Sequence, residues 1–228
     1  MAEPGTTRGR GNGATRSRSL GTRKVPRAVR EPQMLQAAGR IFAGRGFHEA
    51  SMDEIAAAAG VSKPMLYHYF GSKEGLYFAY LDLSYREIVA AIDEAVGEVA
   101  RAGGSPEEQL RRGARAYYRY VGEHQDAFRV LFREMGDPGG ELARQRGRLG
   151  RRVAAAVDAI LVRGEPARRP HLGTEAVAEA FLGAARSLAD WWLDHPEVSA
   201  DDLADQLTDL FLAGLGSPGG AGGASSAP

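Results

Sequence analysis

The residue types between positions 62 and 73 are those of a surface that binds a polyanion. Lys63 and Lys73 supply positive charge, and Tyr67 and Tyr69 supply flat rings that each carry a hydroxyl group. Side chains of these types contact phosphates and sugars in protein–DNA interfaces, while contacts to base edges provide sequence preference. This stretch is therefore the first candidate for a functional surface.

Two short helices separated by a glycine are predicted to position these side chains. Ser51 and Glu54 have the spacing of a capping box, which begins a helix that Gly60 ends. Ser62 can cap a second short helix, and Pro64 fits its first turn because a missing N–H costs nothing there. With a longer helix before them, the pair has the pattern of a helix-turn-helix module, whose second helix enters the DNA major groove.

The helical period indicates which side chains of the second helix face outward. Leu66 and Phe70 lie four residues apart and are predicted to face the core. The side chains left on the outer side are Lys63, Met65, Tyr67, His68 and Tyr69. An alternative is that Tyr67, Tyr69 and Phe70 are simply core residues, and the capping box by itself says nothing about DNA.

Lys73 is predicted to begin the next helix, with Ser72 as its cap. A positive charge at a helix N-terminus opposes the helix dipole. A bound phosphate would relieve that conflict, and the neighbouring backbone N–H groups favour an anion.

Several short motifs occur together in residues 51–74. They are Ile55-Ala56, Ala59-Gly60-Val61-Ser62, Leu66-Tyr67-x-Tyr69-Phe70 and Ser72-Lys73. Together they resemble the DNA-binding domain of the TetR family of bacterial regulators, over about Arg27–Ile88. The resemblance implies a three-helix head and an all-helical carboxy-terminal domain that binds a small effector and dimerises.

The resemblance also implies a role for each DNA-contact residue. It gives base-facing positions to Lys63, Pro64 and Met65, sugar–phosphate and thymine-methyl contacts to Tyr67, His68 and Tyr69, a phosphate contact to Lys73, and positions near the DNA backbone to Ser51 and Met52. The family often has a small residue or threonine where this chain has Met65, so the operator sequence is hard to predict.

Composition divides the chain into a helical centre with two polar ends. Residues 1–23 form a basic arm and residues 216–228 a glycine-rich tail, and neither can bury enough apolar surface to be ordered. We expect residues 24–88 to form the DNA-binding domain, with the helix-turn-helix at 51–70, and residues 89–215 to form the ligand-binding and dimerisation domain. The arginines of the arm either only solubilise it or add nonspecific phosphate and minor-groove contacts.

Apolar residues at helical spacing predict an all-α chain of about nine helices. The first helix carries its apolar residues from Met34 to Phe42 and stops at residues 44–46, and a long helix over Lys73–Arg101 would measure about 44 Å. The later patterns lie at Leu110–Val121, Phe128–Phe132, Leu142–Leu161, Val177–Trp191 and Leu203–Gly214. No segment alternates with period two over any length.

The net charge of zero hides an asymmetry. Residues 1–23 carry five arginines against one acid, whereas residues 74–228 carry a net charge of −7. A basic amino-terminal third suggests that a polyanion docks at one end. No apolar run approaches the roughly 18 residues of a membrane span, and the arm lacks the apolar region of a secretory signal. We therefore expect a cytoplasmic protein with no membrane partner.

The carboxy-terminal half offers candidates for an effector pocket and a dimer interface. Aromatic residues suited to a planar, mostly apolar effector are Tyr85, Tyr117, Tyr118, Tyr120, His124, Phe128, Phe132 and Phe181, although core packing explains each equally well. The last two helices are expected to form a four-helix bundle with a second copy through Phe181, Leu188, Trp191, Trp192, Leu203, Leu207 and Leu210. Adjacent Trp191 and Trp192 cannot both face inward, so one should meet the partner; a ligand-stacking tryptophan is the alternative.

Catalytic and metal chemistry find little support in the sequence. The chain has no cysteine, and its five histidines lack the spacing of a metal site. Arg111-Arg112 and Arg151-Arg152 are most simply solvated helix faces. We therefore expect no cofactor and no enzyme, but a homodimeric regulator, most simply a repressor that a small effector releases from a palindromic operator. The alternatives are a helical enzyme or small-molecule carrier, and an architectural protein that binds DNA through its arm alone.

Overall fold

The computed structural model describes residues 26–133, 148, 150–159 and 173–216, and all regular structure in them is helical. The helices with defined bounds are α1 (Arg27–Glu49), α2 (Met52–Ala59), α3 (Lys63–Phe70), α4 (Lys73–Arg101), α5 (Pro106–Glu123), α6 (Gln125–Arg133), α8 (Thr174–Trp192) and α9 (Ala200–Gly216). A further helical stretch covers residues 150–159. The predicted all-α class is confirmed. The predicted arm, the tail beyond Gly216, and the positions from Leu142 to Gly147 and at Leu149, Ile160 and Leu161 lie outside the described residues.

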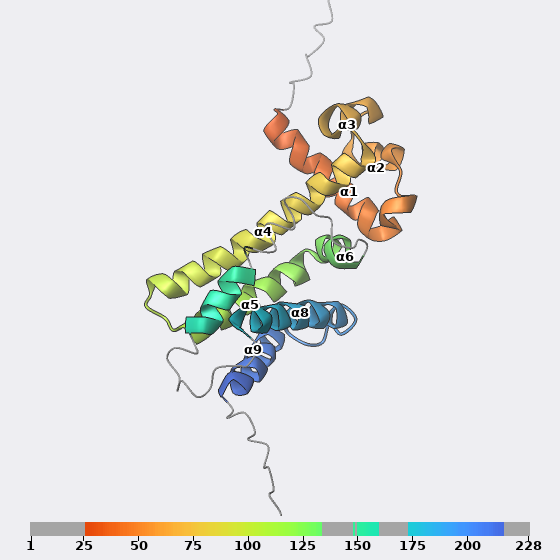
Figure 1. Ribbon diagram of the computed structural model, residues 1–228. Coiled ribbons are helices and arrows are strands. Elements are labelled where there is room, and N and C mark those ends of the chain that lie inside the picture. Colours follow the sequence, from red (N-terminus) through yellow and green to blue (C-terminus); the bar gives the residue numbers. More distant parts are fainter. Residues whose placement is uncertain (1–25, 134–147, 149, 160–172, 217–228) are drawn as a thin grey trace, which may run out of the picture.

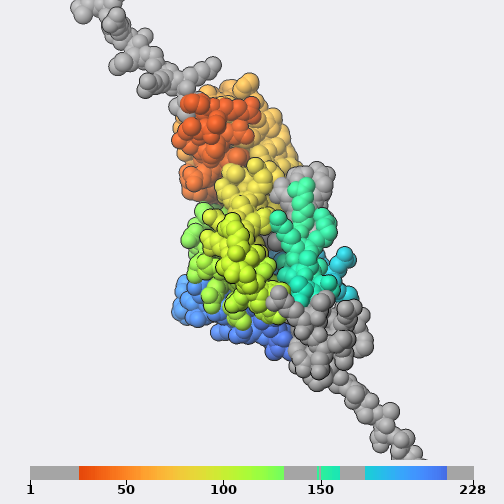
Figure 2. Space-filling view, turned by 90° about the vertical axis from the view of Figure 1, so that its left-hand side faces the viewer, coloured from red at the N-terminus to blue at the C-terminus, as the bar shows by residue number. Residues whose placement is uncertain are grey.

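Helix α4 connects the two ends of the molecule. Helices α1–α3 form a head at one end, and α5, α8, α9 and residues 150–159 form a body at the other, with α4 running from head to body (Figure 1). In the space-filling view, residues 150–159 lie beside α4 on the surface of the body (Figure 2). One continuous helix is therefore shared by both parts.

Helix α1 is longer than the apolar pattern indicated. It begins at Arg27 rather than near Met34, because a polar turn containing the Arg27–Glu31 ion pair (2.8 Å) extends it. The predicted break is present, since Gly46 has a positive φ of 79°, a conformation that glycine adopts readily.

The two short helices begin and end as predicted, with one exception. Ser51 Oγ accepts a hydrogen bond from the Glu54 backbone N–H (3.2 Å), and Glu54 Oε2 accepts one from the Ser51 backbone N–H (3.3 Å). Gly60 ends α2 in the left-handed conformation. Ser62 is the N-cap residue of α3, as predicted, but its side chain makes no capping hydrogen bond.

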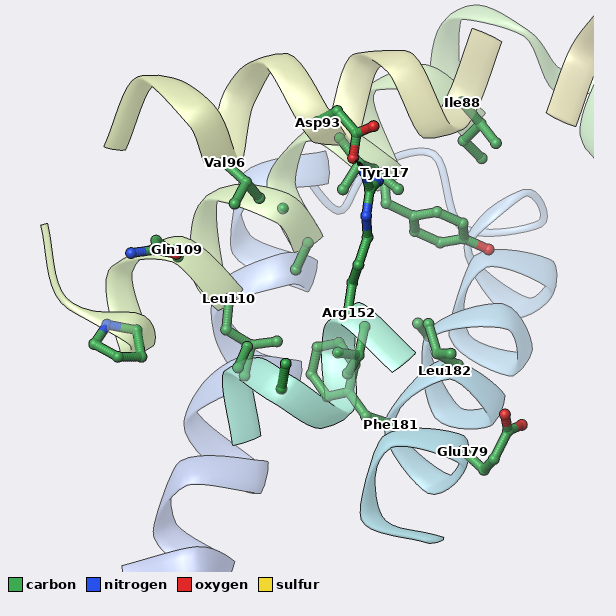
Figure 3. A pocket seen from close by; sticks show the side chains of 18 of the residues that line it. Ile88, Asp93, Val96, Gln109, Leu110, Tyr117, Arg152, Glu179, Phe181 and Leu182 are labelled. Atoms are coloured by element: carbon green, nitrogen blue, oxygen red, sulfur yellow. Dashed lines mark hydrogen bonds and ion pairs between the residues drawn. The ribbon is translucent and has the colours of Figure 1, made fainter. Parts of the chain in front are cut away.

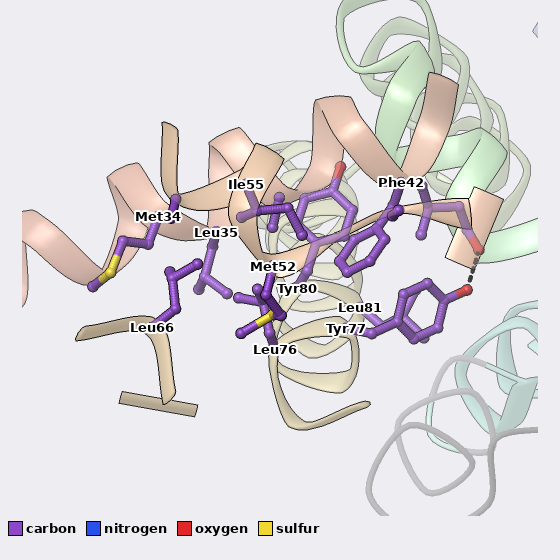
Figure 4. Packing of buried hydrophobic residues seen from close by; sticks show 14 of the residues in the cluster. Met34, Leu35, Phe42, Met52, Ile55, Leu66, Leu76, Tyr77, Tyr80 and Leu81 are labelled. Atoms are coloured by element: carbon purple, nitrogen blue, oxygen red, sulfur yellow. Dashed lines mark hydrogen bonds between the residues drawn. The ribbon is translucent and has the colours of Figure 1, made fainter. Parts of the chain in front are cut away.

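A single hydrophobic core holds the head onto α4 and α6. Phe42 of α1, Ile55 of α2 and Leu66 of α3 are fully buried, and they pack with residues from the first turns of α4 (Figure 4). The Tyr77 hydroxyl of α4 donates to the Val130 carbonyl of α6 (3.3 Å). The orientation of α3 is therefore fixed relative to the start of α4.

Arginines of α5 form ion pairs with aspartates of α9, and we call the three shortest of these pairs the Arg–Asp ladder. The pairs are Arg111–Asp209, Arg115–Asp205 and Arg119–Asp201, with N–O distances of 2.5, 2.6 and 2.6 Å. Both sets of residues recur every four positions, so they line one face of each helix. Arg111 is thus paired across helices, and Arg112 pairs with Glu98, which corrects the interpretation of Arg111-Arg112 as a solvated face.

Candidate nucleic-acid interface and ligand cavity

Helix α3 lies at the tip of the head (Figure 1), and among its residues only Leu66 is buried. Leu66 is fully buried, whereas Tyr67 is 43% exposed and Lys63, Pro64 and His68 are also exposed. This helix therefore anchors itself through Leu66 and leaves four side chains of its outer face open.

Three side chains of α3 are only half-buried. Tyr69 and Phe70 pack against the head core, as the inward orientation of Phe70 predicted. Met65 is half-buried as well, and its sulfur lies 3.4 Å from Arg30 Nη1 of α1. The face of α3 that was predicted to be fully exposed is thus partly covered by α1.

Lys63 is held by an acid from the preceding helix. Its Nζ lies 2.8 Å from Asp53 Oδ2 of α2, and the hydrogen bond to that carboxylate raises the pKa of the Lys63 ammonium. Both side chains face solvent. The pair holds the first residue of α3 beside the first turn of α2, so an approaching phosphate or base competes with Asp53 for it.

Two arginines of α1 that the sequence did not place in the site contact the outer face of α3. Arg27 lies over the Tyr69 ring, with its guanidinium carbon 5.0 Å from the ring centroid, and Arg30 contacts Met65. The thioether is a weak partner of Arg30, and Arg27 also donates from Nε to Glu31 (2.8 Å). Each guanidinium therefore has further N–H groups for a stronger acceptor. Arg27 and Arg30 lie three residues apart, a spacing that would put them on one face of a helix. The sequence prediction missed them because its first helix began only at Met34.

The ammonium of Lys73 has protein partners. Its Nζ donates to the backbone carbonyls of His48 (3.1 Å) and Ala50 (3.0 Å), and it lies 4.6 Å from the centre of the Phe47 ring. Carbonyls at the end of α1 carry partial negative charge, so they offset the unfavourable α4 dipole without a phosphate. The expected need for a phosphate at this position is therefore corrected, although one ammonium proton remains without a hydrogen bond to these carbonyls.

The two candidates at the start of α2 differ in accessibility. The Ser51 side chain is half-buried and occupied by the capping box. Met52 is 5% exposed and packs in the head core, so its side chain is closed to DNA, which corrects its inclusion in the contact set. Only the backbone at the N-terminus of α2 is left for a phosphate there.

A cavity of about 1080 Å³ lies between α4, α5, α8 and residues 150–159 (Figure 3). Of the aromatic candidates, Tyr85, Tyr117 and Phe181 line it. Tyr118, Tyr120 and Phe128 are instead buried in packed clusters, and exposed His124 stands outside the lining. The side chain of Phe132 lies outside the described residues. Most other lining residues are aliphatic, and the sequence-based prediction, which named aromatic residues and a histidine, did not include them.

The candidates for the dimer interface divide into core and surface residues. Phe181, Leu203 and Leu207 are buried within the subunit, so their inclusion in the interface is corrected. Trp191 is 45% exposed and Leu210 is 70% exposed. The remaining two, Leu188 and Trp192, are partly buried and pack against the same core.

The adjacent tryptophans point in different directions, as helix geometry requires. The Trp192 indole N–H donates to the Val198 carbonyl (2.7 Å) and its ring packs on the body core. The Trp191 ring faces outward and stacks on His195, with ring centroids 3.9 Å apart. Trp192 therefore packs within the subunit, and Trp191 lies at the surface.

Family models cover both parts of this arrangement. Residues 34–80 match the model for bacterial regulatory proteins of the tetR family, and residues 103–215 match a tetracyclin repressor-like C-terminal domain. A helix-turn-helix head on an all-helical body is the architecture of a class of DNA-binding transcriptional regulators.

Individual proteins agree with the models. A TetR-like regulator of known structure from Rhodococcus sp. RHA1 is 38% identical, with a TM-score of 0.69 over 84% of this chain and 98% of that chain. The regulator PfmR from Thermus thermophilus is 26% identical, with a TM-score of 0.67 over 81% and 99% of the two chains. The chain belongs to the TetR family of helix-turn-helix transcriptional regulators.

Curated relatives match over shorter lengths. The activator FasR from Mycolicibacterium smegmatis is 37% identical over 109 residues, which are 48% of each chain. The regulator EthR from the same species is 32% identical over 95 residues, which are 42% of each. The chain thus spans about half the length of these two relatives or less. None of the described helices is both long enough and apolar enough to cross a bilayer.

Proposed function

We propose that this regulator binds a palindromic operator as a homodimer and represses transcription until a small effector releases it. The observation that carries the DNA-binding part is the outer face of α3, where Lys63, Tyr67 and His68 are exposed above the buried Leu66. A short helix anchored in this way can enter the major groove, with its first residues toward the base edges.

The proposed contacts follow from the position of each residue on the head. Lys63, Pro64 and Met65 lie in the first turn of α3 and would face bases, whereas Tyr67, His68 and Tyr69 would meet the sugar–phosphate backbone and thymine methyls. Arg27 and Arg30 flank the same face from α1. In this proposal Ser51 and Lys73 would lie near the DNA backbone at the edge of this surface.

The homodimer is supported by apolar surface on α8 and α9. Trp191 and Leu210 are large apolar side chains that the subunit leaves exposed at the end opposite the head. A second copy would cover them in a symmetric interface, in which each residue meets its counterpart or a neighbour. Two heads held in this way would reach major grooves about 34 Å apart along the DNA.

Effector control is supported by the cavity and by its position against α4. A volume of about 1080 Å³ lies at the upper end of the range of small-molecule sites. Ile88, Ile92 and Val96 of α4 line it, and the same helix carries the head core residues Leu76 and Tyr77. A ligand that favours one position of α4 would thereby change operator affinity, and operator binding would change ligand affinity equally.

The sign of regulation requires its own test, because the relative FasR is named as an activator. A reporter gene placed behind the selected operator, with and without this chain, measures it directly. Lower expression with the protein supports repression, and higher expression replaces that part of the proposal with activation.

Operator binding is tested by selecting the full chain on random DNA duplexes. A palindromic winner with half-sites about one turn apart, bound roughly 10³-fold or more above random DNA, supports the proposal. An equally tight, steeply salt-dependent affinity for every duplex would overturn it in favour of nonspecific binding. A deletion of residues 1–23 separates the arm from the head, since sequence preference must survive that deletion.

A further inference from the structure

The cavity is long and mostly aliphatic. Its α4 wall runs from Tyr85 to Gly97, about 18 Å at the rise of an α-helix. Aliphatic residues from the other elements complete the lining, among them Leu110 of α5, Val153 of the 150–159 stretch and Leu182 of α8. Such walls fit an extended apolar molecule better than a flat aromatic one.

Two of the charged residues in the lining already satisfy each other. Arg152 reaches across the cavity to Asp93 of α4 and forms an ion pair with its carboxylate (Figure 3). Glu179 of α8 points away from this pair in the same view. The Arg152–Asp93 pair is therefore neutral as a unit and gives a ligand no net charge to recognise.

The hydroxyl of Tyr117 is different, because it has no hydrogen-bond partner within the part of the chain that the structure describes. Its two tyrosine neighbours on α5 are bonded: Tyr118 donates to the Ala185 carbonyl (3.1 Å) and Tyr120 to the Ser84 carbonyl (3.2 Å). Tyr117 instead lines the cavity, and burial raises the pKa of its hydroxyl, so the group stays protonated. The side chain is half-buried, and a donor without an acceptor is costly where the protein excludes water, so a ligand oxygen would satisfy it.

Arg186 of α8 provides positive charge in the same cavity lining. It is exposed to solvent, and among the described residues it forms no ion pair. The bond from Tyr118 to Ala185 fixes α5 against α8 next to both residues. The Arg186 charge also acts to lower the pKa of Tyr117, against the larger effect of burial, so the two groups interact.

We propose that Tyr117 and Arg186 form a carboxylate-binding subsite, and that the effector is an extended aliphatic molecule ending in that group. The Tyr117 hydroxyl donates to one carboxylate oxygen, and the Arg186 guanidinium pairs with the anion. The aliphatic part lies along Ile88, Ile92 and Val96. This inference rests on the proposed effector control, because it names the chemistry of the same cavity.

The test uses the whole 228-residue chain and three probes of equal alkyl length: dodecanoate, dodecan-1-ol and dodecyltrimethylammonium, each below its micelle concentration. Direct binding is measured by calorimetry. We expect dodecanoate to bind at least tenfold tighter than the other two, because only it offers a charged acceptor. Equal affinity for the three probes, or preference for the cation, overturns the subsite.

Two pairs of variants locate the carboxylate. Tyr117→Phe and Arg186→Gln should each weaken dodecanoate roughly ten- to hundredfold, while leaving dodecan-1-ol nearly unchanged. The matched controls are Tyr80→Phe, which changes a buried tyrosine of the head core outside the lining, and Arg151→Gln, which removes an exposed arginine outside the lining. Loss of dodecanoate affinity in the controls as large as in the test variants would contradict the assignment.

A separate measurement distinguishes a failure of the carboxylate subsite from a failure of the proposed effector release. Operator affinity is measured with and without saturating dodecanoate. Carboxylate-specific binding that leaves the operator bound supports the subsite and overturns effector release. Release of the operator by dodecan-1-ol, without the Tyr117-dependent preference for dodecanoate, supports effector release and overturns the subsite.

Discussion

The ammonium of Lys73 donates a hydrogen bond to the backbone carbonyl of Ala50 at 3.0 Å, so the first residue of α4 holds the segment that joins α1 to α2. A second bond from the same group reaches the His48 carbonyl. A residue placed to contact DNA by its position in the family pattern therefore also supports the fold of the head. The two roles make different predictions.

Replacing Lys73 by methionine is expected to lower the free energy of unfolding by about 1–3 kcal/mol, since two charge-assisted hydrogen bonds are lost. Urea titration measures this directly. Lys63→Met is the matched control, because Lys63 is exposed and its ammonium pairs with Asp53 at the surface. An unchanged unfolding midpoint in Lys73→Met, together with a shallower salt dependence of DNA affinity, would assign this lysine to phosphate alone.

Asp53→Asn is expected to strengthen DNA binding severalfold. The substitution frees Lys63 from its acidic partner and removes a negative charge from the surface that faces phosphates. Fluorescence anisotropy over a series of salt concentrations measures the effect, which should shrink as salt rises. Glu94→Gln makes an equal change of charge in the middle of α4 and should leave the affinity unchanged. Weaker binding by Asp53→Asn would mean that the ion pair positions Lys63 for its contact.

Arg30→Ala is expected to weaken DNA binding and to relax base preference at the position near Met65. Arg30 lies against the Met65 sulfur, so its loss removes a positive charge and frees the methionine side chain to change conformation. Selection on random duplexes compares base preference between this variant and Arg40→Ala, which removes an exposed arginine farther along α1. Identical preferences for wild type and Arg30→Ala would exclude a positioning role.

Gly39→Ala should destabilise the head, whereas Gly44→Ala on the same helix should not. A Cβ at Gly39 would lie 2.3 Å from the Tyr80 ring, so α1 and α4 would have to separate. Overpacking of this kind costs about 1–3 kcal/mol. A Cβ at Gly44 meets no atom within 4 Å, and alanine is the better helix former there. Thermal denaturation of both variants gives the comparison, and equal stability of the two would contradict the close packing.

The Arg–Asp ladder predicts a loss of stability in acid. The hydrogen bonds from Arg119 and Arg115 lower the pKa of Asp201 and Asp205, respectively. Groups with a lowered folded-state pKa stabilise the fold above their unfolded pKa of about 4, and that contribution is lost as pH falls through the folded value.

The pairs are largely solvated, so each is expected to contribute about 1 kcal/mol or less. Measured between pH 6 and about pH 3, the midpoint of urea unfolding should fall less in Asp205→Asn than in wild type. Parallel curves for the two proteins would show that Asp205 has an ordinary pKa in the folded state.

The helices of the head were predictable because their signals are local. Ser51, Glu54 and Gly60 mark the bounds of α2 within a few residues of each other, and the long stripe of α4 has a regular period. The early start of α1 at Arg27 was missed because polar first turns carry no apolar pattern. Ser62 is the N-cap of α3, but the lack of a side-chain bond there was not predictable, because that bond depends on a side-chain conformation that sequence does not specify.

The sites were less predictable, since they depend on contacts between distant segments. Phe181 and Leu207 share the stripe of Trp191 and Leu210, and only the packing of α5 against α8 and α9 separates core from surface. The neighbours Tyr117 and Tyr118 look equivalent in sequence. One faces the cavity and the other bonds to Ala185 because adjacent helical residues differ by about 100° in direction.

Because α4 is one continuous helix, a small tilt at the cavity becomes a large displacement of the head. At about 1.5 Å per residue, Lys73 lies about 28 Å from Ile92 in the cavity wall. A tilt of α4 by only about 7° around Ile92 moves the head about 3.4 Å, which equals the rise along the DNA helix axis from one phosphate of a strand to the next. Two heads that must fit fixed grooves therefore tolerate a rotation of α4 by only a few degrees. A larger tilt would shift each head by more than one base pair along the DNA.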